Sequence, residues 1–149
     1  MTASPPTAGR LIAVDWGERR IGLARSDDRQ ILAQPLTTLT RRPGKRFPMQ
    51  QLIALLRDQA AVGVVVGLPL AEDGSEGDAA GHARALAADI ARRAGLPVEL
   101  WDERLTTARA LRAVREMGGT TAGRKEDIDA LAATLLLQHY LDARRGSGL

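Results

Sequence analysis

Hydrophobic residues along this chain fall either into short continuous runs or into longer segments with helical spacing. Residues 10–16 form a nearly continuous apolar run, which is typical of a strand buried on both faces. A tight turn at 17–19 leads to predicted strands at 20–26 and 31–39. Such short connections favour an antiparallel meander. Two further apolar runs predict buried strands, at 62–66 and 98–101.

Helical spacing first appears after the meander. Residues 47–60 predict an amphipathic helix that turns Met49, Leu52, Ile53 and Leu56 toward the core. A second helix is expected to run to about residue 94, because a Gly-Leu-Pro sequence follows there. Ser75 and Asp78 have the spacing of a capping box for its first turn.

The last third of the chain predicts two more helices, at 108–117 and 127–144, separated by a Gly- and Thr-rich loop. On the last helix, one stripe is expected to face the core: Ile128, Leu131, Leu135 and His139. The predicted order is therefore β-β-β-α-β-α-β-α. This is the element order of the α/β ribonuclease H-like fold, in which three antiparallel strands are extended by two parallel ones and helices cover both faces.

Composition limits the kinds of protein that are compatible with this pattern. A chain of 149 residues that is 44% hydrophobic is expected to form one domain, here residues 10–145, after a flexible tail at 1–9. The absence of cysteine excludes disulfides and thiolate chemistry, and two histidines are too few for a multi-histidine metal site. No apolar run is long enough to span a membrane and the first ten residues do not resemble a signal peptide, so a cytoplasmic location is expected.

The charge of the chain is compatible with a polyanionic partner. The net charge is +3 and the sequence pI is near 10.1, although an ordinary solvated surface explains these values equally well. The basic loop at 41–46 has the same two interpretations, a phosphate contact or a solvated connection. Because only four residues are aromatic, stacking of successive bases is not expected, and phosphate contacts should dominate any binding of nucleic acid.

Three acidic residues lie in contexts that catalysis explains better than folding does. Asp15 ends the first apolar run, Glu103 follows the last predicted strand, and Asp129 lies near the start of an apolar helix. Each has a simpler explanation: a turn former, an ion pair within the Asp-Glu-Arg triplet, or a favourable charge at a helix N-terminus. Carboxylates from distant segments repel one another unless a cation lies between them, and oxygen ligands favour Mg²⁺ or Mn²⁺. Gly67, which follows a buried strand, would let the backbone approach a ligand at the same edge of the sheet.

Four segments together resemble a known family. They are AVDWGERRIGLARSD, VVVGLPLAEDGSEG, DERLTTARA and KEDIDALAATLLLQHYLD, and they are similar to the signature blocks of the YqgF (RuvX-like) nucleases, in the same order. The resemblance implies a cytoplasmic, metal-dependent nuclease with a ribonuclease H-like fold, and places its catalytic acids at Asp15, Glu103 and Asp129. The family is associated with maturation of the 5′ end of pre-16S ribosomal RNA and, by older inference, with Holliday junction cleavage. The chain departs from the family at Glu18 and Arg19, where a small polar residue and a lysine are common.

The resulting hypothesis is phosphodiester hydrolysis with two Mg²⁺ or Mn²⁺ ions held by the three acids. Four cations are expected to hold the scissile strand through its phosphates: Arg19, Arg104, Arg124 and Lys125. The expected partner is nucleic acid, precursor ribosomal RNA or branched DNA, with ribosomal particles as a further possibility and either a monomer or a homodimer as the acting form.

Three alternatives to this hypothesis stay open at this point. A Holliday junction resolvase would use the same site but would require a symmetric dimer, because a junction needs two paired cuts. A non-catalytic module that binds ribosomes would keep its function without the acids. An ATPase of the actin and sugar-kinase superfamily also uses an Asp-x-Gly turn, but those proteins normally need a duplicated domain, for which 149 residues are too few.

Overall fold

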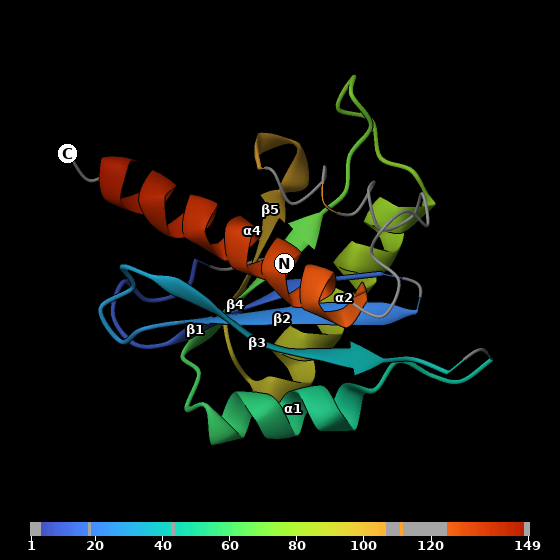
Figure 1. Cartoon of the computed structure of the whole chain (residues 1–149), viewed down its shortest axis with the longest axis horizontal. Helices are drawn as coiled ribbons and strands as arrows, with labels where there is room; N and C mark the ends of the chain where they lie inside the picture. Colours follow the sequence, from blue (N-terminus) through green and yellow to red (C-terminus); the bar gives the residue numbers. More distant parts are fainter. Residues whose placement is uncertain (1–3, 18, 43, 107–110, 112–124, 148–149) are drawn as a thin grey trace.

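The protein is built on one five-stranded sheet, in a computed structural model that describes residues 4–17, 19–42, 44–106, 111 and 125–147 (Figure 1). In chain order, the strands are β1 (Leu11–Asp15), β2 (Arg20–Ser26), β3 (Ala33–Thr40), β4 (Gly63–Leu68) and β5 (Val98–Asp102). The helices are α1 (Met49–Asp58), α2 (Asp78–Ala94), the short 3₁₀ helix η1 (Glu103–Leu105) and α4 (Lys125–Ser147).

The strands lie in the order β3-β2-β1-β4-β5. β2 pairs antiparallel with both β1 and β3, whereas β1–β4 and β4–β5 are parallel pairs. The predicted mixed sheet of the ribonuclease H-like fold is therefore confirmed. Since β3 runs parallel to β1, the strands β1, β3, β4 and β5 all end at the same side of the sheet, called the carboxyl edge below.

Helices cover both faces of the sheet, and each face has its own hydrophobic core (Figure 1). Along β1 the side chains alternate: Leu11 and Ala13 pack with α4, while Ile12 and Val14 pack with α1 and α2. All four are fully buried, as expected for a continuous apolar strand covered on both sides. The alternation determines which face each residue at the end of β1 points to.

The buried stripe of α4 differs from the predicted one. Leu131 is 43% exposed, and Ile128, Leu135 and His139 are only partly buried. The buried residues are instead Ala130, Ala132, Ala133, Leu136, Leu137, Tyr140 and Leu141, together with Asp129. The helix is apolar on most of its circumference, so periodicity alone did not fix its rotation. The rotation of α4 is instead fixed by its close approach to the sheet, because the small side chains of two successive alanines lie at the contact.

The predicted capping box of α2 is wrong. The helix begins at Asp78 with Gly77 as its N-cap, and no side chain caps it. The Ser75 backbone N–H instead donates to Asp73 Oδ1 at 2.8 Å, which closes a turn within the preceding loop. The end of α2 agrees with its prediction, because Gly95 adopts the left-handed conformation with φ of 68°.

Residues 4–9, part of the predicted flexible tail, lie against the domain. Pro5 is buried, and its carbonyl accepts a hydrogen bond of 2.7 Å from Arg144 Nη2. Gln30 Nε2 donates to the carbonyls of Pro6 and Gly9 at 2.9 Å. This contact was not expected, and the domain limits of 10–145 stay a prediction. The predicted helix at 108–117, apart from residue 111, and the loop at 118–123 lie outside the described residues. Within the described part of the chain, no helix is long and apolar enough to cross a membrane.

Candidate active site

Asp15 ends β1 at the carboxyl edge and is only 3% exposed. It follows Leu11 and Ala13 in the alternation along the strand, so its side chain belongs to the face that α4 covers. Its partner on β2 is Gly22. A buried carboxylate at the end of an apolar strand is costly unless cations or hydrogen-bond donors compensate its charge.

Asp129, in the second turn of α4, lies against that same pair of residues. A Cβ added to Gly22 would stand 2.0 Å from the Asp129 carbonyl oxygen and 3.0 Å from the Ala130 nitrogen. The glycine therefore lets the backbone of α4 rest directly on β2, beside Asp15. The Asp129 side chain is 2% exposed. Helix position and sheet register thus bring residues 15 and 129 to one place.

Glu103 approaches from the other side of β1. It begins the 3₁₀ helix η1, immediately after β5, and is 2% exposed. A Cβ added to Gly67 would lie 2.5 Å from Glu103 Oε1. Gly67 follows Val66, the last β4 residue in register with β1, where it is paired with Val14. The glycine next to the end of β1 therefore leaves room for the Glu103 carboxylate.

All three acids predicted from the sequence are thus buried at the carboxyl edge, on the face covered by α4. Asp129 forms an ion pair with Arg20, whose Nε lies 3.0 Å from Asp129 Oδ2. The Arg20 side chain is 21% exposed, so it extends from solvent to the buried site. Sequence reasoning singled out Arg19 and missed Arg20, because the pairing of Arg20 with Asp129 depends on how α4 packs on β2.

The donor set fits a hard divalent cation, because it consists of carboxylate oxygens alone. Among the described residues, no three Asp, Glu, His or Cys side chains already stand as a complete metal-ligand set. The Arg20 guanidinium supplies positive charge to Asp129 in this arrangement. The residues therefore match such an ion in chemistry and placement, while their side chains would have to adjust to bind it.

Arg104 organises a loop beside the site. Its guanidinium pairs with Asp102 at 2.8 Å and donates to the carbonyls of Ala71 and Glu72. The hydrogen bond to Asp102 raises the pKa of Arg104 above its ordinary value. The ion pair within the Asp-Glu-Arg triplet, which was the simpler interpretation, is therefore present. A phosphate contact by Arg104 stays a prediction.

The other predicted phosphate-binding cations are only partly placed. Arg19 is exposed immediately before β2, where its carbonyl accepts a 2.7 Å hydrogen bond from the Arg41 backbone N–H. Lys125 is the first residue of α4, and its side chain lies outside the described part of the structure, as do residues 18 and 124.

Both histidines pack against tryptophans. The His82 ring of α2 stacks on Trp16 with 5.0 Å between ring centroids and 13° between planes. Trp101 Nε1 donates to His139 Nδ1 at 3.0 Å. The first contact ties the residue after Asp15 to α2, so it helps to fix the end of β1. The sequence suggested no role for either pair.

The fold and the buried acids at the carboxyl edge define a protein of the ribonuclease H-like class. Residues 9–143 match the family model described as "RuvX: Holliday junction resolvase". The chain belongs to this family, as the resemblance to YqgF (RuvX-like) proteins predicted.

Curated relatives cover nearly the whole chain. A protein from Anaeromyxobacter sp. is 43% identical over 91% of this chain and 98% of its own length, and one from Chloroflexus aurantiacus is 41% identical over 92% and 89%. Both are named "Putative pre-16S rRNA nuclease". Among solved structures, RuvC of T. thermophilus in complex with a Holliday junction superposes with a TM-score of 0.57 and 18% identity, covering 92% of this chain and 96% of that one. At this identity the likeness supports the fold alone.

Proposed function

We propose that this protein is a metal-dependent nuclease that hydrolyses phosphodiester bonds in precursor 16S ribosomal RNA, at or near the 5′ end, in the cytoplasm. One observation carries the proposal: three carboxylates from β1, η1 and α4 are buried together at the carboxyl edge, in a chain of the RuvX family. Folding alone does not call for three buried acids at one end of a sheet. The substrate class comes from the names of the relatives.

Asp15, Glu103 and Asp129 are the residues that would hold Mg²⁺ or Mn²⁺. Bound there, such ions would activate water and stabilise the charge on the leaving oxygen. Asp15 lies between the other two, because its neighbours in the sheet contact Asp129 on one side and Glu103 on the other. The ion pair with Arg20 would hold the Asp129 carboxylate in place for such an ion.

The substrate would be held by its phosphates rather than by its bases. Arg19, Arg104, Arg124 and Lys125 are the cations that we assign to the scissile strand, each contributing a charge-assisted hydrogen bond. Arg19 is exposed at the carboxyl edge, and Arg104 lies next to Glu103 in sequence. Such contacts carry little sequence information, so recognition would depend on the shape and accessibility of the RNA.

Cleavage of Holliday junctions is the second candidate, and the description of the matching family favours it. The same carboxylates would act on a DNA strand. Resolution of a junction requires two paired cuts, and therefore a symmetric dimer that presents two sites. The two candidates thus differ in substrate and in the acting oligomer, not in the chemistry of the site.

A panel of labelled substrates tests the proposal. Purified protein is incubated in Mn²⁺ with an RNA that carries the precursor 5′ end of 16S rRNA, and separately with a four-way DNA junction. We expect cleavage of the RNA, none in EDTA, and loss of activity by orders of magnitude in Asp15→Asn. Asp58→Asn, an exposed acid at the far end of α1, is the matched control and should cleave like the parent.

Each other outcome has a definite meaning. Cleavage of the junction alone, by a dimer, would replace the RNA assignment with the second candidate. Full activity of Asp15→Asn, or equal activity in EDTA, would contradict metal-dependent hydrolysis. Binding without cleavage of either substrate would favour a non-catalytic module. Melting curves of both variants verify that they are folded.

A further inference from the structure

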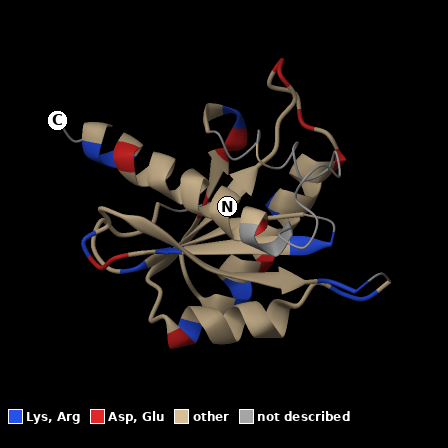
Figure 2. Cartoon of the chain, viewed as in Figure 1, with Lys and Arg blue, Asp and Glu red and all other residues tan. Residues whose placement is uncertain are grey.

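A strongly basic loop follows β3 at the carboxyl edge. This basic loop, residues 41–46, carries Arg41, Arg42, Lys45 and Arg46. Figure 2 shows it as a blue extension beyond the end of β3. The sequence from 29 to 57 contains six Lys or Arg residues and no Asp or Glu. This stretch therefore contains no acidic residue that could neutralise the charge of the loop.

The loop lies beside the start of β2, the strand whose Arg20 pairs with Asp129. The Arg41 backbone N–H donates to the Arg19 carbonyl at 2.7 Å, and Thr40 pairs with Arg20 across β2 and β3. Arg20 in turn forms the ion pair with Asp129. A phosphate backbone that leaves the candidate active site across the start of β2, toward β3, would therefore meet the basic loop next.

Within the described part of the structure, no ion pair or side-chain hydrogen bond engages Arg41, Arg42, Lys45 or Arg46. Arg84, Arg92 and Arg104, by contrast, each pair with an acid. The loop nevertheless has a defined turn, because the Lys45 N–H donates to the Arg42 carbonyl at 3.0 Å. Four like charges on a short turn repel one another, and a polyanion relieves this repulsion.

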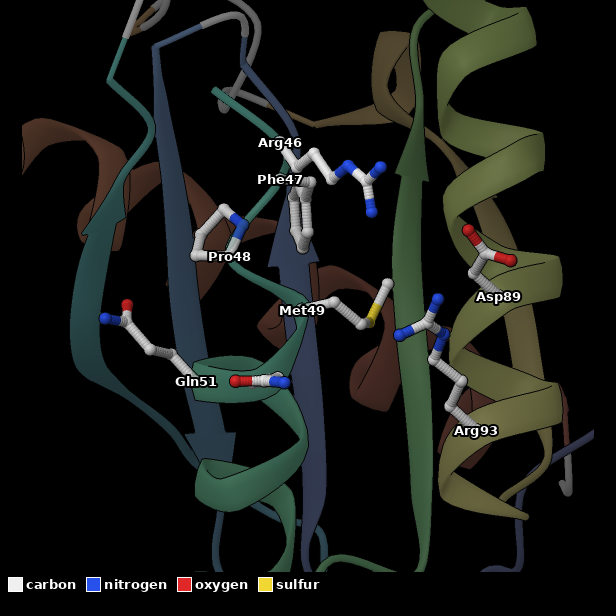
Figure 3. A pocket seen from close by; sticks show the side chains of 8 residues that line it. Arg46, Phe47, Pro48, Met49, Gln51, Asp89 and Arg93 are labelled. Carbon is white, nitrogen blue, oxygen red and sulfur yellow. The ribbon is translucent and has the colours of Figure 1, made fainter.

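A cavity of about 610 Å³ continues from the loop between the start of α1 and α2 (Figure 3). The side chains of Arg46 and Arg93 border it from opposite sides, and Phe47 and Met49 supply an apolar lining. Its one acid, Asp89, pairs with Arg92 at 2.6 Å. Guanidinium groups suit phosphate oxygens, and the apolar lining suits the carbon atoms of a sugar or base.

The opposite side of the carboxyl edge carries negative charge. The loop between β4 and α2 contains Glu72, Asp73 and Glu76. A hydrogen bond with Ser75 lowers the pKa of Asp73, and one from Arg84 lowers the pKa of Glu76, so both are ionised at neutral pH. Figure 2 shows the acids of this loop in red, away from the basic loop. Because Arg84 and Arg104 offset part of this charge, a phosphate backbone is attracted more strongly on the β3 side than on the β4 side.

We propose that the basic loop and the cavity between Arg46 and Arg93 form a second phosphate-binding surface, which holds the part of the nucleic acid that flanks the cleaved bond. The inference rests on the proposed function for the class of substrate. The surface supplies affinity and sets the side on which the substrate leaves the site. It does not discriminate between base sequences, because its groups suit the phosphate backbone of the nucleic acid rather than the edges of the bases.

Two matched double variants test this surface. Arg42→Gln/Lys45→Gln removes two charges from the basic loop, and Arg29→Gln/Arg57→Gln removes two exposed charges from the opposite edge of the sheet. Both lower the formal net charge from +3 to +1, by subtraction of two. Binding of labelled polyuridine and of a labelled RNA duplex is measured by fluorescence anisotropy, in EDTA, at several salt concentrations. Melting curves confirm that both variants fold.

The loop variant should bind both probes more weakly than the control variant. Its plot of log affinity against log salt should be less steep by about 1.4–1.8, from about 0.7–0.9 per phosphate contact. The affinity lost between 50 and 200 mM salt should therefore be about 7- to 12-fold smaller than in the parent. Arg46→Gln/Arg93→Gln should behave like the loop variant. Parent-like binding by that pair would overturn the part that concerns the cavity.

Equal binding by the loop variant and the Arg29/Arg57 control would overturn the proposal. Because binding in EDTA does not need cleavage, this result is independent of the proposed chemistry. A protein that cleaves nothing, yet loses affinity when the loop is neutralised, would contradict the nuclease and support the surface. A protein that cleaves RNA, but whose RNA affinity does not change when the loop is neutralised, would support the nuclease and contradict the surface.

Discussion

Gly22→Ala should destabilise the protein by forcing α4 away from the sheet. The added Cβ would lie 2.0 Å from the Asp129 carbonyl oxygen and 2.4 Å from its carbonyl carbon. Carbon–oxygen contacts are ordinarily no shorter than about 3.3 Å, so the two backbones must separate by roughly 1.3 Å. The neighbours are backbone atoms, which cannot rotate aside. The contact between β2 and the start of α4 must therefore open.

The magnitude follows from the cost of overpacking. Forcing extra atoms into a packed interior costs about 1–3 kcal/mol, and a backbone clash belongs at the upper end. The alanine also restricts the unfolded chain, which offsets less than about 1 kcal/mol. We therefore expect a loss of about 2 kcal/mol in the free energy of unfolding. For a domain of this size, that lowers the melting temperature by about 4–8 °C.

Gly81→Ala is the matched control. Gly81 lies in α2, is exposed, and has nothing within 4 Å of the position of an added Cβ. Alanine in a helix interior is favoured over glycine by about 0.5–1 kcal/mol, so this variant should be slightly more stable than the parent. Thermal and urea unfolding of the parent, Gly22→Ala and Gly81→Ala measure these differences in stability. A Gly22→Ala protein as stable as the parent would refute the contact between α4 and β2 on which the site depends.

Three further predictions concern single side chains. Gly67→Ala should cost less stability than Gly22→Ala but should weaken Mn²⁺ binding, measured by calorimetry, because its Cβ meets the movable Glu103 carboxylate. Tyr140→Phe should lose about 1 kcal/mol in urea unfolding, since Tyr140 donates a 2.8 Å hydrogen bond to Glu99. Burial raises the pKa of Tyr140, so the unfolded chain ionises first and the parent should lose this stability as pH rises above about 10, whereas the phenylalanine variant should not. Arg20→Gln should lower the melting temperature in EDTA, and Mn²⁺ should restore more of it than in the parent, because the cation replaces the lost guanidinium.

Much of the fold could be predicted from the sequence, because buried strands and amphipathic helices leave distinct periodicities. The boundaries of β2 were predicted to the residue, and the other strands to within two residues. The rotation of α4 was not predictable in the same way. A helix that is apolar nearly all round can pack on several faces, and the contact of Ala132 and Ala133 with the sheet selects one of them.

The candidate site was predictable in its acids but not in the residues that bring them together. Asp15, Glu103 and Asp129 each stood out as a charge in an apolar context. Gly22 and Arg20 did not, because their importance depends on strand register and on the distant helix α4. Long-range pairing of this kind leaves no local signal in a single sequence.

The central claim is that Asp15, Glu103 and Asp129 form one metal site. Mn²⁺ binding to the parent and to Asp15→Asn, Glu103→Gln and Asp129→Asn, followed by electron paramagnetic resonance, tests it most directly. Loss of a residue that only hydrogen-bonds a metal ligand weakens metal binding by roughly 10- to 100-fold. We predict that each of the three variants, which lose a ligand itself, weakens Mn²⁺ binding by at least this much. Asp58→Asn should bind Mn²⁺ like the parent. Parent-like Mn²⁺ affinity in the three folded variants would contradict a shared metal site and, with it, metal-dependent hydrolysis by these acids.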